Sequence, residues 1–281
     1  MSERADAHIH LFENGFQSGF TKRPGVNIDE PACYTSLAAD HDVSAALVVG
    51  FCGGEAYANN NEYLAAMAAE HPWANPVAYF VPKSPPDIQT LEARWQQGFV
   101  GVSCYVFNEE SVDALHRIDD AFWSWLVDRG CIVSVNSNAQ YWPAWQHILQ
   151  RHGELRLVMS HLGAPPQQAT APAPDVARGN LATVLELSAY PGCHVKLSGF
   201  YALSDPSSDY PHRSSWPYVE VLLNDFGPGR LLWGSDFTPC LENLSFPQTF
   251  GHFAMMPFLN DAQRQRIEGA NLLELLERAR A

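Results

Sequence analysis

An eight-stranded α/β barrel, the (β/α)8 or TIM-barrel class, is the fold that this sequence predicts. Short apolar runs of strand length alternate with helix-like segments along the chain and form eight strand–helix units. Most of these runs are continuously apolar, such as residues 45–49, which is typical of parallel strands buried on both faces. A doubly wound open sheet would carry a glycine-rich turn after its first strand, but here that strand ends in histidines and a long loop.

The apolar runs predict strands at 4–10, 44–51, 76–82, 99–106, 131–136, 155–160, 193–198 and 230–235. The segments between them predict helices at 33–41, 59–71, 86–97, 117–129, 140–152, 178–190 and 214–226, with further helices after the last strand. Turn residues mark three of the helix ends: Gly98, Gly130 and Pro191-Gly192. The elements therefore alternate in the order that a closed barrel requires.

The longest loops are expected after strands one, six and seven, at 11–32, 163–177 and 199–213. In a barrel these loops lie on the face where binding and catalytic residues collect. Segment 163–177 contains too much proline for a helix and is open to two interpretations, a semi-rigid lid or a disordered surface excursion.

Length and composition fit one large domain over residues 1–281, since the chain is 46% hydrophobic and shows no repeat or linker. The net charge of −14 argues against nucleic acid and anionic membranes as partners and leaves a small-molecule substrate, with a homo-oligomer possible. No apolar stretch has the length of a signal peptide core or a membrane span. The six scattered cysteines form no C-x-x-C pair, so reduced thiols in the cytoplasm are expected.

Four side chains that carry chemistry end predicted strands. His8 and His10 are two residues apart at the end of the first strand, so they should point to the same side. His161 ends the sixth strand, and Asp236 ends the eighth, which neighbours the first in a closed barrel. Packing roles for the histidines and an N-cap role for Asp236 are the alternatives. Because all four coincide at strand ends, the sequence favours one catalytic pocket and a hydrolase.

These residue types suit the activation of water. Asp236 can accept a proton from water or bind a divalent cation, while His8 and His10 can hold that cation or stabilise an oxyanion. The sequence therefore leaves two possibilities: one divalent metal, preferably zinc, on His8, His10 and Asp236, or catalysis without metal. Five histidines on predicted helices or at their ends are expected at the surface or in packing: His41, His71, His116, His147 and His152. His212 and Arg213 could reach the pocket, but a solvated loop is the preferred interpretation.

Several fragments, in order along nearly the whole chain, carry a family resemblance: residues 6–10, 98–102, 158–165, 194–199, 231–237 and Asn271. With them the chain resembles the amidohydrolase superfamily, and within it the amidohydrolase-2 branch of sugar lactonases and 2-pyrone-4,6-dicarboxylate lactonase. The resemblance implies a barrel hydrolase that opens a cyclic ester, either a sugar lactone or a lactone from aromatic catabolism. It makes Asp236 the residue that activates water, with His8, His10 and His161 around the reacting carbonyl or a metal.

The chain departs from the family pattern at two strands. Strand five ends near Asn136, where the superfamily often has a metal-binding histidine, and no lysine or glutamate ends strand four, so a bridged two-metal site is not expected. Ser103 stands where the dicarboxylate lactonase pattern has an arginine. Tyr105 and Asn136 offer hydrogen bonds to hydroxyl groups, and with Ser103, Arg23 and Arg213 they form the predicted substrate-binding set. Other basic groups expected at the mouth, Lys22, Lys83 and Arg178, are compatible with one anionic group on the substrate.

Two further functions remain open at this stage. Related barrels with a similar set of three histidines and an aspartate decarboxylate aromatic acids with a bound metal, although they are usually longer than this chain. Alternatively, the missing strand-five ligand could mark a barrel that binds a small molecule without turning it over.

Overall fold

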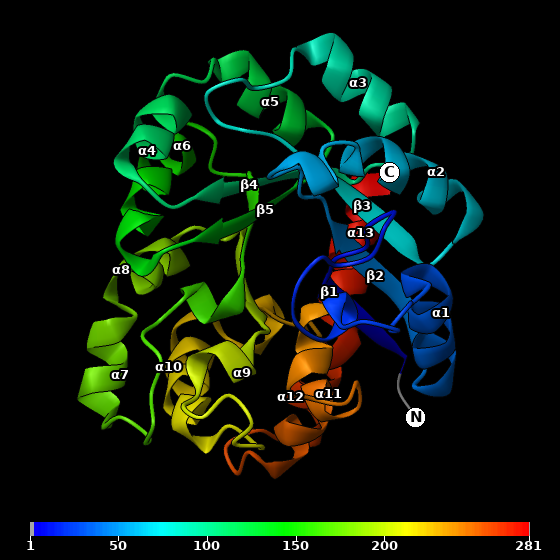
Figure 1. Ribbon diagram of the computed structural model, residues 1–281. Coiled ribbons are helices and arrows are strands. Elements are labelled where there is room, and N and C mark those ends of the chain that lie inside the picture. The colour runs from blue at the N-terminus through cyan, green and yellow to red at the C-terminus, as the bar shows by residue number, and fades with distance from the viewer. Residues whose placement is uncertain (1–2, 281) are drawn as a thin grey trace.

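Eight parallel strands pair in sequence order, β1 to β8, in the computed structural model, which describes residues 3–280 (Figure 1). The strands are β1 Arg4–Ile9, β2 Val43–Val49, β3 Ala74–Tyr79, β4 Gly101–Val106, β5 Ile132–Ser137, β6 Arg156–Met159, β7 Cys193–Leu197 and β8 Leu231–Trp233. The predicted single-domain (β/α)8 barrel is confirmed, and every strand overlaps the apolar run that predicts it. Residues 1–2 and 281, the outer ends of the predicted domain, lie outside the described residues.

The barrel closes where β8 meets β1, at the carboxyl ends of both strands. Ile9 forms a bridge with Phe237, and the Phe237 carbonyl accepts a 2.6 Å hydrogen bond from the backbone N–H of His10. The backbone N–H of Asp236 donates to the carbonyl of His8 at 2.8 Å. Closure thus joins the two segments that carry the predicted catalytic residues.

The helices surround the strands (Figure 1). Their bounds are α1 Glu30–Asp40, α2 Asn60–Glu70, α3 Ile88–Gln96, α4 Glu109–His116, α5 Asp120–Asp128, α6 Gln146–Arg151, α7 Pro174–Asn180, α8 Ala182–Leu185, α9 Phe200–Leu203, α10 Trp216–Phe226, α11 Gln248–Gly251, α12 Asp261–Gln265 and α13 Asn271–Arg280. Five of them, α1, α2, α3, α5 and α10, match predicted helices within a few residues. None of the helices in residues 3–280 has the length and apolar character needed to cross a bilayer.

Two predicted helices differ from the observed ones, and one observed helix was not predicted. The unpredicted helix is α4, whose N-cap Asn108 accepts a hydrogen bond from the N–H of Ser111. The predicted helix at 140–152 starts as a 3₁₀ segment, Ala139–Trp145, that contains Pro143 and passes into α6. The one at 178–190 is divided among α7, α8 and a 3₁₀ turn, Glu186–Ala189.

The proline-rich segment 163–177 is partly helical, which corrects the sequence prediction. Pro174 occupies the first helical position of α7, where its missing N–H leaves no hydrogen bond unmade. Upstream, the N–H of Gln168 donates to the Leu203 carbonyl, and the Gln168 carbonyl accepts from the N–H of Asp205, both at 2.9 Å. The loops after β6 and β7 are therefore paired, and the disordered interpretation is wrong.

The amino-terminal end of the barrel is filled by apolar side chains. Inward-facing residues of the strands, such as Ala7, Leu47 and Ile132, form a buried cluster with Leu272 and Leu276 of α13. Figure 1 shows this last helix behind the strands. Because α13 packs under the barrel, the interior is accessible from the opposite end, where the strands finish.

The long loop after β1 is anchored by one buried carboxylate, that of Glu30. It accepts hydrogen bonds from the backbone N–H groups of Phe12 at 2.8 Å and Phe16 at 2.7 Å. It also accepts one from the Thr238 hydroxyl at 2.6 Å. Glu30 thereby joins the loop after β1 to the loop after β8 at the mouth of the barrel.

Candidate active site

A bulge in β1 sets the directions of the first two site residues. Asp6 pairs with Ala46 and Ile9 with Val48, so β1 advances three residues where β2 advances two. His8 and His10 point to the same side, as their spacing predicts, and their Nε2 atoms lie 3.1 Å apart. Nδ1 of His10 lies 2.8 Å from the carbonyl oxygen of Val49.

Asp6 fastens this part of β1 to its neighbours. Its Oδ1 accepts hydrogen bonds from the N–H of Ser235 at 2.8 Å and of His8 at 3.1 Å, and its Oδ2 accepts from the Tyr34 hydroxyl at 3.1 Å. Burial raises the pKa of Asp6 to about 6. The side chain is therefore a structural brace behind the site and not a group that faces it.

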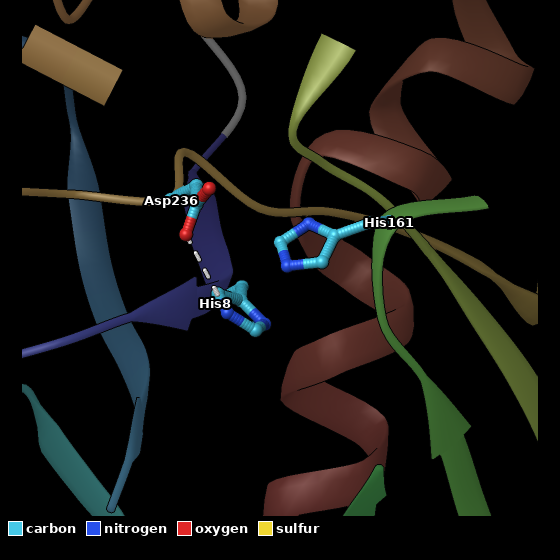
Figure 2. Close-up of side chains that lie close together, drawn as sticks. All are labelled: His8, His161 and Asp236. Carbon is cyan, nitrogen blue, oxygen red and sulfur yellow. Dashed lines mark ion pairs between the residues drawn. The ribbon is translucent and has the colours of Figure 1, made fainter. Parts of the chain in front are cut away.

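Three side chains from distant strand ends meet at the mouth. His8, His161 and Asp236 each place one potential ligand atom within 4.8 Å of the others, and Figure 2 shows them pointing toward one another. Nε2 of His8 lies 3.6 Å from Oδ1 of Asp236, and the rings of His8 and His161 have centroids 4.7 Å apart. His161 is partly exposed, so solvent reaches the group from its side.

Unusual backbone and two glycines make this meeting possible. Asp236 and His161 have φ values of +60° and +52°, a left-handed conformation that non-glycine residues adopt at a cost and that is often found at functional sites. A Cβ on Gly199 would lie 2.6 Å from His161 Nδ1, and one on Gly234 would lie 2.7 Å from His8 Cβ. Larger residues at these positions would displace the imidazoles.

Hydroxyl groups hold the acid and one histidine in place. The Tyr201 hydroxyl, on α9, donates a 2.6 Å hydrogen bond to Oδ2 of Asp236, which leaves Oδ1 facing His8. Oγ of Ser198 lies 3.0 Å from Nδ1 of His161, so Nε2 is the ring nitrogen left for a substrate or metal. Sequence reasoning missed both hydroxyls, although Ser198 lies inside one of the family fragments.

Lys196 of β7 is the third residue that sequence reasoning missed. It is fully buried, and its Nζ lies 3.0 Å from Nδ1 of His8 and 2.7 Å from Oγ of Ser134. The alternation of a strand places Lys196 and Ser198 on the same inward face of β7. That alternation was the available signal: a charged residue in an otherwise apolar strand, two positions before a site serine.

Burial keeps the imidazoles neutral. It lowers the pKa of His10 to about 4, and it lowers the pKa values of His8 and His161 as well. The nearby charge of Lys196 lowers the His8 pKa further. Burial also lowers the pKa of Lys196, to about 7. At neutral pH the histidines are therefore uncharged groups that can bind a metal or exchange hydrogen bonds.

The five predicted substrate-binding residues lie in different places. Tyr105 of β4 and Asn136 of β5 pair in register and are partly exposed on the inward face of the barrel. Ser103 is buried below them and donates a 2.7 Å hydrogen bond to the Gly50 carbonyl. Arg23 forms a 2.8 Å ion pair with Glu242, and Arg213 is exposed with its guanidinium 5.0 Å from the centre of the Trp216 ring.

Aromatic rings occupy the mouth on the side of β2, β3 and β4. The ring centroid of Phe51 lies 5.0 Å from that of Tyr105 and 5.5 Å from that of Tyr79, and the two tyrosine rings are 5.7 Å apart. Phe107 extends the group, 5.7 Å from Tyr105. We call Phe51, Tyr79, Tyr105 and Phe107 the aromatic wall.

Two expectations about basic residues and histidines need correction. Arg178 lies in α7, where it pairs with Asp225 of α10 in the outer layer, and not in a loop at the mouth. His212 is fully buried, and neither of its ring nitrogens has a hydrogen-bond partner among the described residues, so the solvated-loop interpretation is wrong for it. Arg213, its neighbour, is exposed as that interpretation predicts.

The amidohydrolase family model matches residues 5–278. The chain belongs to this family. Two curated relatives are L-fucono-1,5-lactonases: 32% identity over 130 residues to the one from Burkholderia ambifaria and 29% over 150 residues to the one from Burkholderia multivorans. These alignments cover 46% and 50% of this chain, and only 38% and 50% of the relatives.

Solved structures share the fold of this amidohydrolase. A zinc-bound amidohydrolase from Burkholderia multivorans has a TM-score of 0.76 and 20% identity, covering 98% of this chain and 99% of the other. A probable 2-pyrone-4,6-dicarboxylic acid hydrolase from Acinetobacter baumannii has a TM-score of 0.74 and 16% identity, with the same coverage of both chains. At these identities the likeness establishes the barrel alone.

The donor set of this amidohydrolase suits one zinc ion by residue type. His8, His161 and Asp236 are two imidazoles and a carboxylate, a combination found in catalytic zinc sites that keep one position open for water. The metal-binding set predicted from the sequence contained His10 in place of His161. In the structure Nδ1 of His10 lies 2.8 Å from the Val49 carbonyl oxygen and its Nε2 lies 3.1 Å from Nε2 of His8, so the predicted set with His10 stays a prediction.

Proposed function

We propose that this amidohydrolase is a lactonase, a hydrolase that opens a cyclic ester. One observation carries the proposal: Asp236 presents an oxygen toward His8 at the barrel mouth, while Tyr201 holds its other oxygen. Membership of the amidohydrolase family and the two partly aligned L-fucono-1,5-lactonases support the assignment. A carboxylate held in this way, with imidazoles beside it, is suited to general-base catalysis.

In the proposed reaction, Asp236 accepts a proton as the oxygen of a water molecule attacks the lactone carbonyl. His8 and His161 stabilise the negative charge that develops on the carbonyl oxygen. The tetrahedral intermediate then breaks the ring C–O bond, and Asp236 returns its proton to the leaving alkoxide. The product is the open hydroxy acid, and every atom of the water is accounted for.

The cofactor belongs to this proposal: at most one divalent ion, preferably zinc, held by His8, His161 and Asp236. When bound, such an ion lowers the pKa of a coordinated water from about 15.7 to about 7. Catalysis without metal gains roughly 10²–10⁴-fold from a placed general base, which is sufficient for an activated ester.

For the substrate, we propose a neutral small-molecule lactone, from sugars or from aromatic catabolism. The aromatic wall offers flat, uncharged surfaces, and Tyr105 and Asn136 add groups that can bond to hydroxyls. Two of the basic side chains expected at the mouth form ion pairs with carboxylates: Lys83 pairs with Glu110 and Arg23 with Glu242. A cytoplasmic location is part of the proposal, in keeping with six unpaired cysteines.

The test is proton release across a panel of sugar, muconolactone-type and dicarboxylate lactones, with metal-stripped and zinc-supplemented enzyme side by side. Asp236→Asn, which preserves the shape of the side chain, is expected to reduce turnover of the best lactone by about 10³-fold or more. Tyr201→Phe is the matched control: it keeps the carboxylate, removes only its hydrogen bond, and is expected to lose about tenfold.

Full activity of Asp236→Asn would refute the assignment of the base. Inactivity of the wild-type enzyme on every lactone in both preparations, together with CO2 release from a dihydroxybenzoate, would replace the lactonase with a decarboxylase.

A further inference from the structure

Lys196 is a fully buried lysine that no carboxylate in residues 3–280 neutralises within ion-pair distance. Its Nζ instead contacts one hydroxyl, that of Ser134 at 2.7 Å, and one imidazole nitrogen, Nδ1 of His8 at 3.0 Å. Burying an amine without an opposite charge is costly, so a structural role alone is a poor account of this residue. Its place behind His8 indicates a role in the site.

The hydrogen bonds of the two neighbouring histidines determine where their hydrogens lie. The Val49 carbonyl can only accept, so Nδ1 of His10 carries a hydrogen and its Nε2, in the neutral ring, is bare. Nε2 of His8, at 3.1 Å, must therefore be the donor of the bond between the rings. The Nδ1 of neutral His8 is then bare and needs a donor, which the Lys196 amine supplies.

We propose that, in the metal-free enzyme, Lys196 is a positioning residue that fixes the Nε2–H tautomer of His8; a zinc ion on Nε2 of His8 would displace this hydrogen. In that tautomer the hydrogen is on the nitrogen that lies 3.1 Å from Nε2 of His10 and 3.6 Å from Oδ1 of Asp236. An Nδ1–H tautomer would set two bare nitrogens against each other and offer no hydrogen to a developing oxyanion. The tautomer follows from the geometry alone, whereas its catalytic consequence rests on the lactonase function proposed above.

The tautomer can be observed directly, without substrate. In chelator-treated enzyme with ¹⁵N-labelled histidine, the ¹⁵N shifts distinguish a bare from a protonated ring nitrogen, and His8→Gln identifies the His8 signals. We expect a bare Nδ1 and a protonated Nε2 in the wild-type enzyme, and both tautomers in Lys196→Met. Ser160→Ala is the matched control, because Oγ of Ser160 lies 3.4 Å from the same nitrogen and its loss should leave the tautomer unchanged.

Kinetics supply the second measurement. Lys196→Met, which keeps the length of the side chain and removes its donors, should lower kcat by about 10²–10³-fold with little change in KM. A purely structural role would instead lower Tm and leave kcat intact in the folded fraction. Ser134→Ala, a milder variant that keeps the amine and removes its other partner, serves if Lys196→Met does not fold; it should also partly mix the tautomers.

The two proposals fail in different ways. A wild-type His8 with its hydrogen on Nδ1 would overturn the role of Lys196, whatever the substrate proves to be. Full lactonase activity of a folded Lys196→Met would overturn it as well. Inactivity on every lactone with the expected tautomer present would reject the lactonase function and leave the positioning of His8 intact.

Discussion

The two sides of the barrel mouth differ in chemistry although the same kind of strand builds them. The side formed by β6, β7, β8 and β1 carries His161, Lys196, Asp236 and His8. Lys196 contacts His8, His8 lies within ion-pair distance of Asp236, and His161 contacts Ser198. The side formed by β2, β3 and β4 carries the aromatic wall, whose rings touch one another. On the proposed function, one side controls protons and charge, while the other determines the shape of the substrate that fits.

Physical chemistry explains why each side is internally consistent. Buried polar groups are costly unless they satisfy one another, so the polar side must be a connected and rigid network. Aromatic rings at centroid distances of 5.0–5.7 Å gain energy from tilted and edge contacts without needing charges. On the proposed function, substitutions on the polar side should therefore reduce kcat, and those in the aromatic wall should raise KM.

After Asp236→Asn, the largest effect is expected on the polar side, from His161→Asn. Asparagine keeps a polar atom near Ser198 but removes the nitrogen that faces Asp236 and His8. We expect kcat to fall by about 10²–10³-fold with KM nearly unchanged, because a donor to the transition state is lost. Steady-state kinetics on the best lactone measure this. A change confined to KM would show that His161 acts in substrate binding. The polar side and the aromatic wall would then not differ in their effects on kcat and KM.

A smaller effect is expected in the aromatic wall, from Tyr105→Ala. Removing the ring takes away contacts with Phe51 and Tyr79 and one face of the mouth. We expect KM to rise by about tenfold, the equivalent of roughly 1.4 kcal/mol, with kcat retained. Tyr105→Phe keeps the ring and separates stacking from hydroxyl bonding. If both variants lose kcat and keep KM, Tyr105 takes part in the chemistry.

The smallest effect is expected from mild acid. Burial lowers the pKa values of His8, His10 and His161, that of His10 to about 4, so these rings take up protons only below the ordinary histidine value of 6.5. As pH falls from 8 to 6.5, histidine protonation should reduce kcat/KM by less than about twofold. The acidic decline of the pH profile should be centred at a pH below 6.5. A limb centred at 6.5 would mean that a site imidazole is solvated or that Lys196, whose pKa burial lowers to about 7, controls the rate, and Lys196→Met distinguishes the two.

The strands and the four central residues were predictable from the sequence. Continuous apolar runs identify strands buried on both faces, and a barrel brings the carboxyl ends of such strands together. His8, His161 and Asp236 could therefore be placed in one pocket although more than 150 residues separate the first two along the chain. The helices were less predictable: α4 was missed, and the predicted helix at 178–190 is divided, because local capping and turns override a broad helical pattern.

By itself, then, the sequence determined the barrel, the order of its strands and the residues at their ends, because these depend on apolar periodicity and position along a strand. Only the tertiary structure decided which nitrogen of His8 faces Lys196, that Tyr201 holds Asp236, and that four rings at the ends of β2, β3 and β4 form the aromatic wall. It also decided that Arg23 pairs with Glu242. Such contacts join residues far apart in the chain, and strand register and barrel closure set them to within an ångström, which no local pattern encodes.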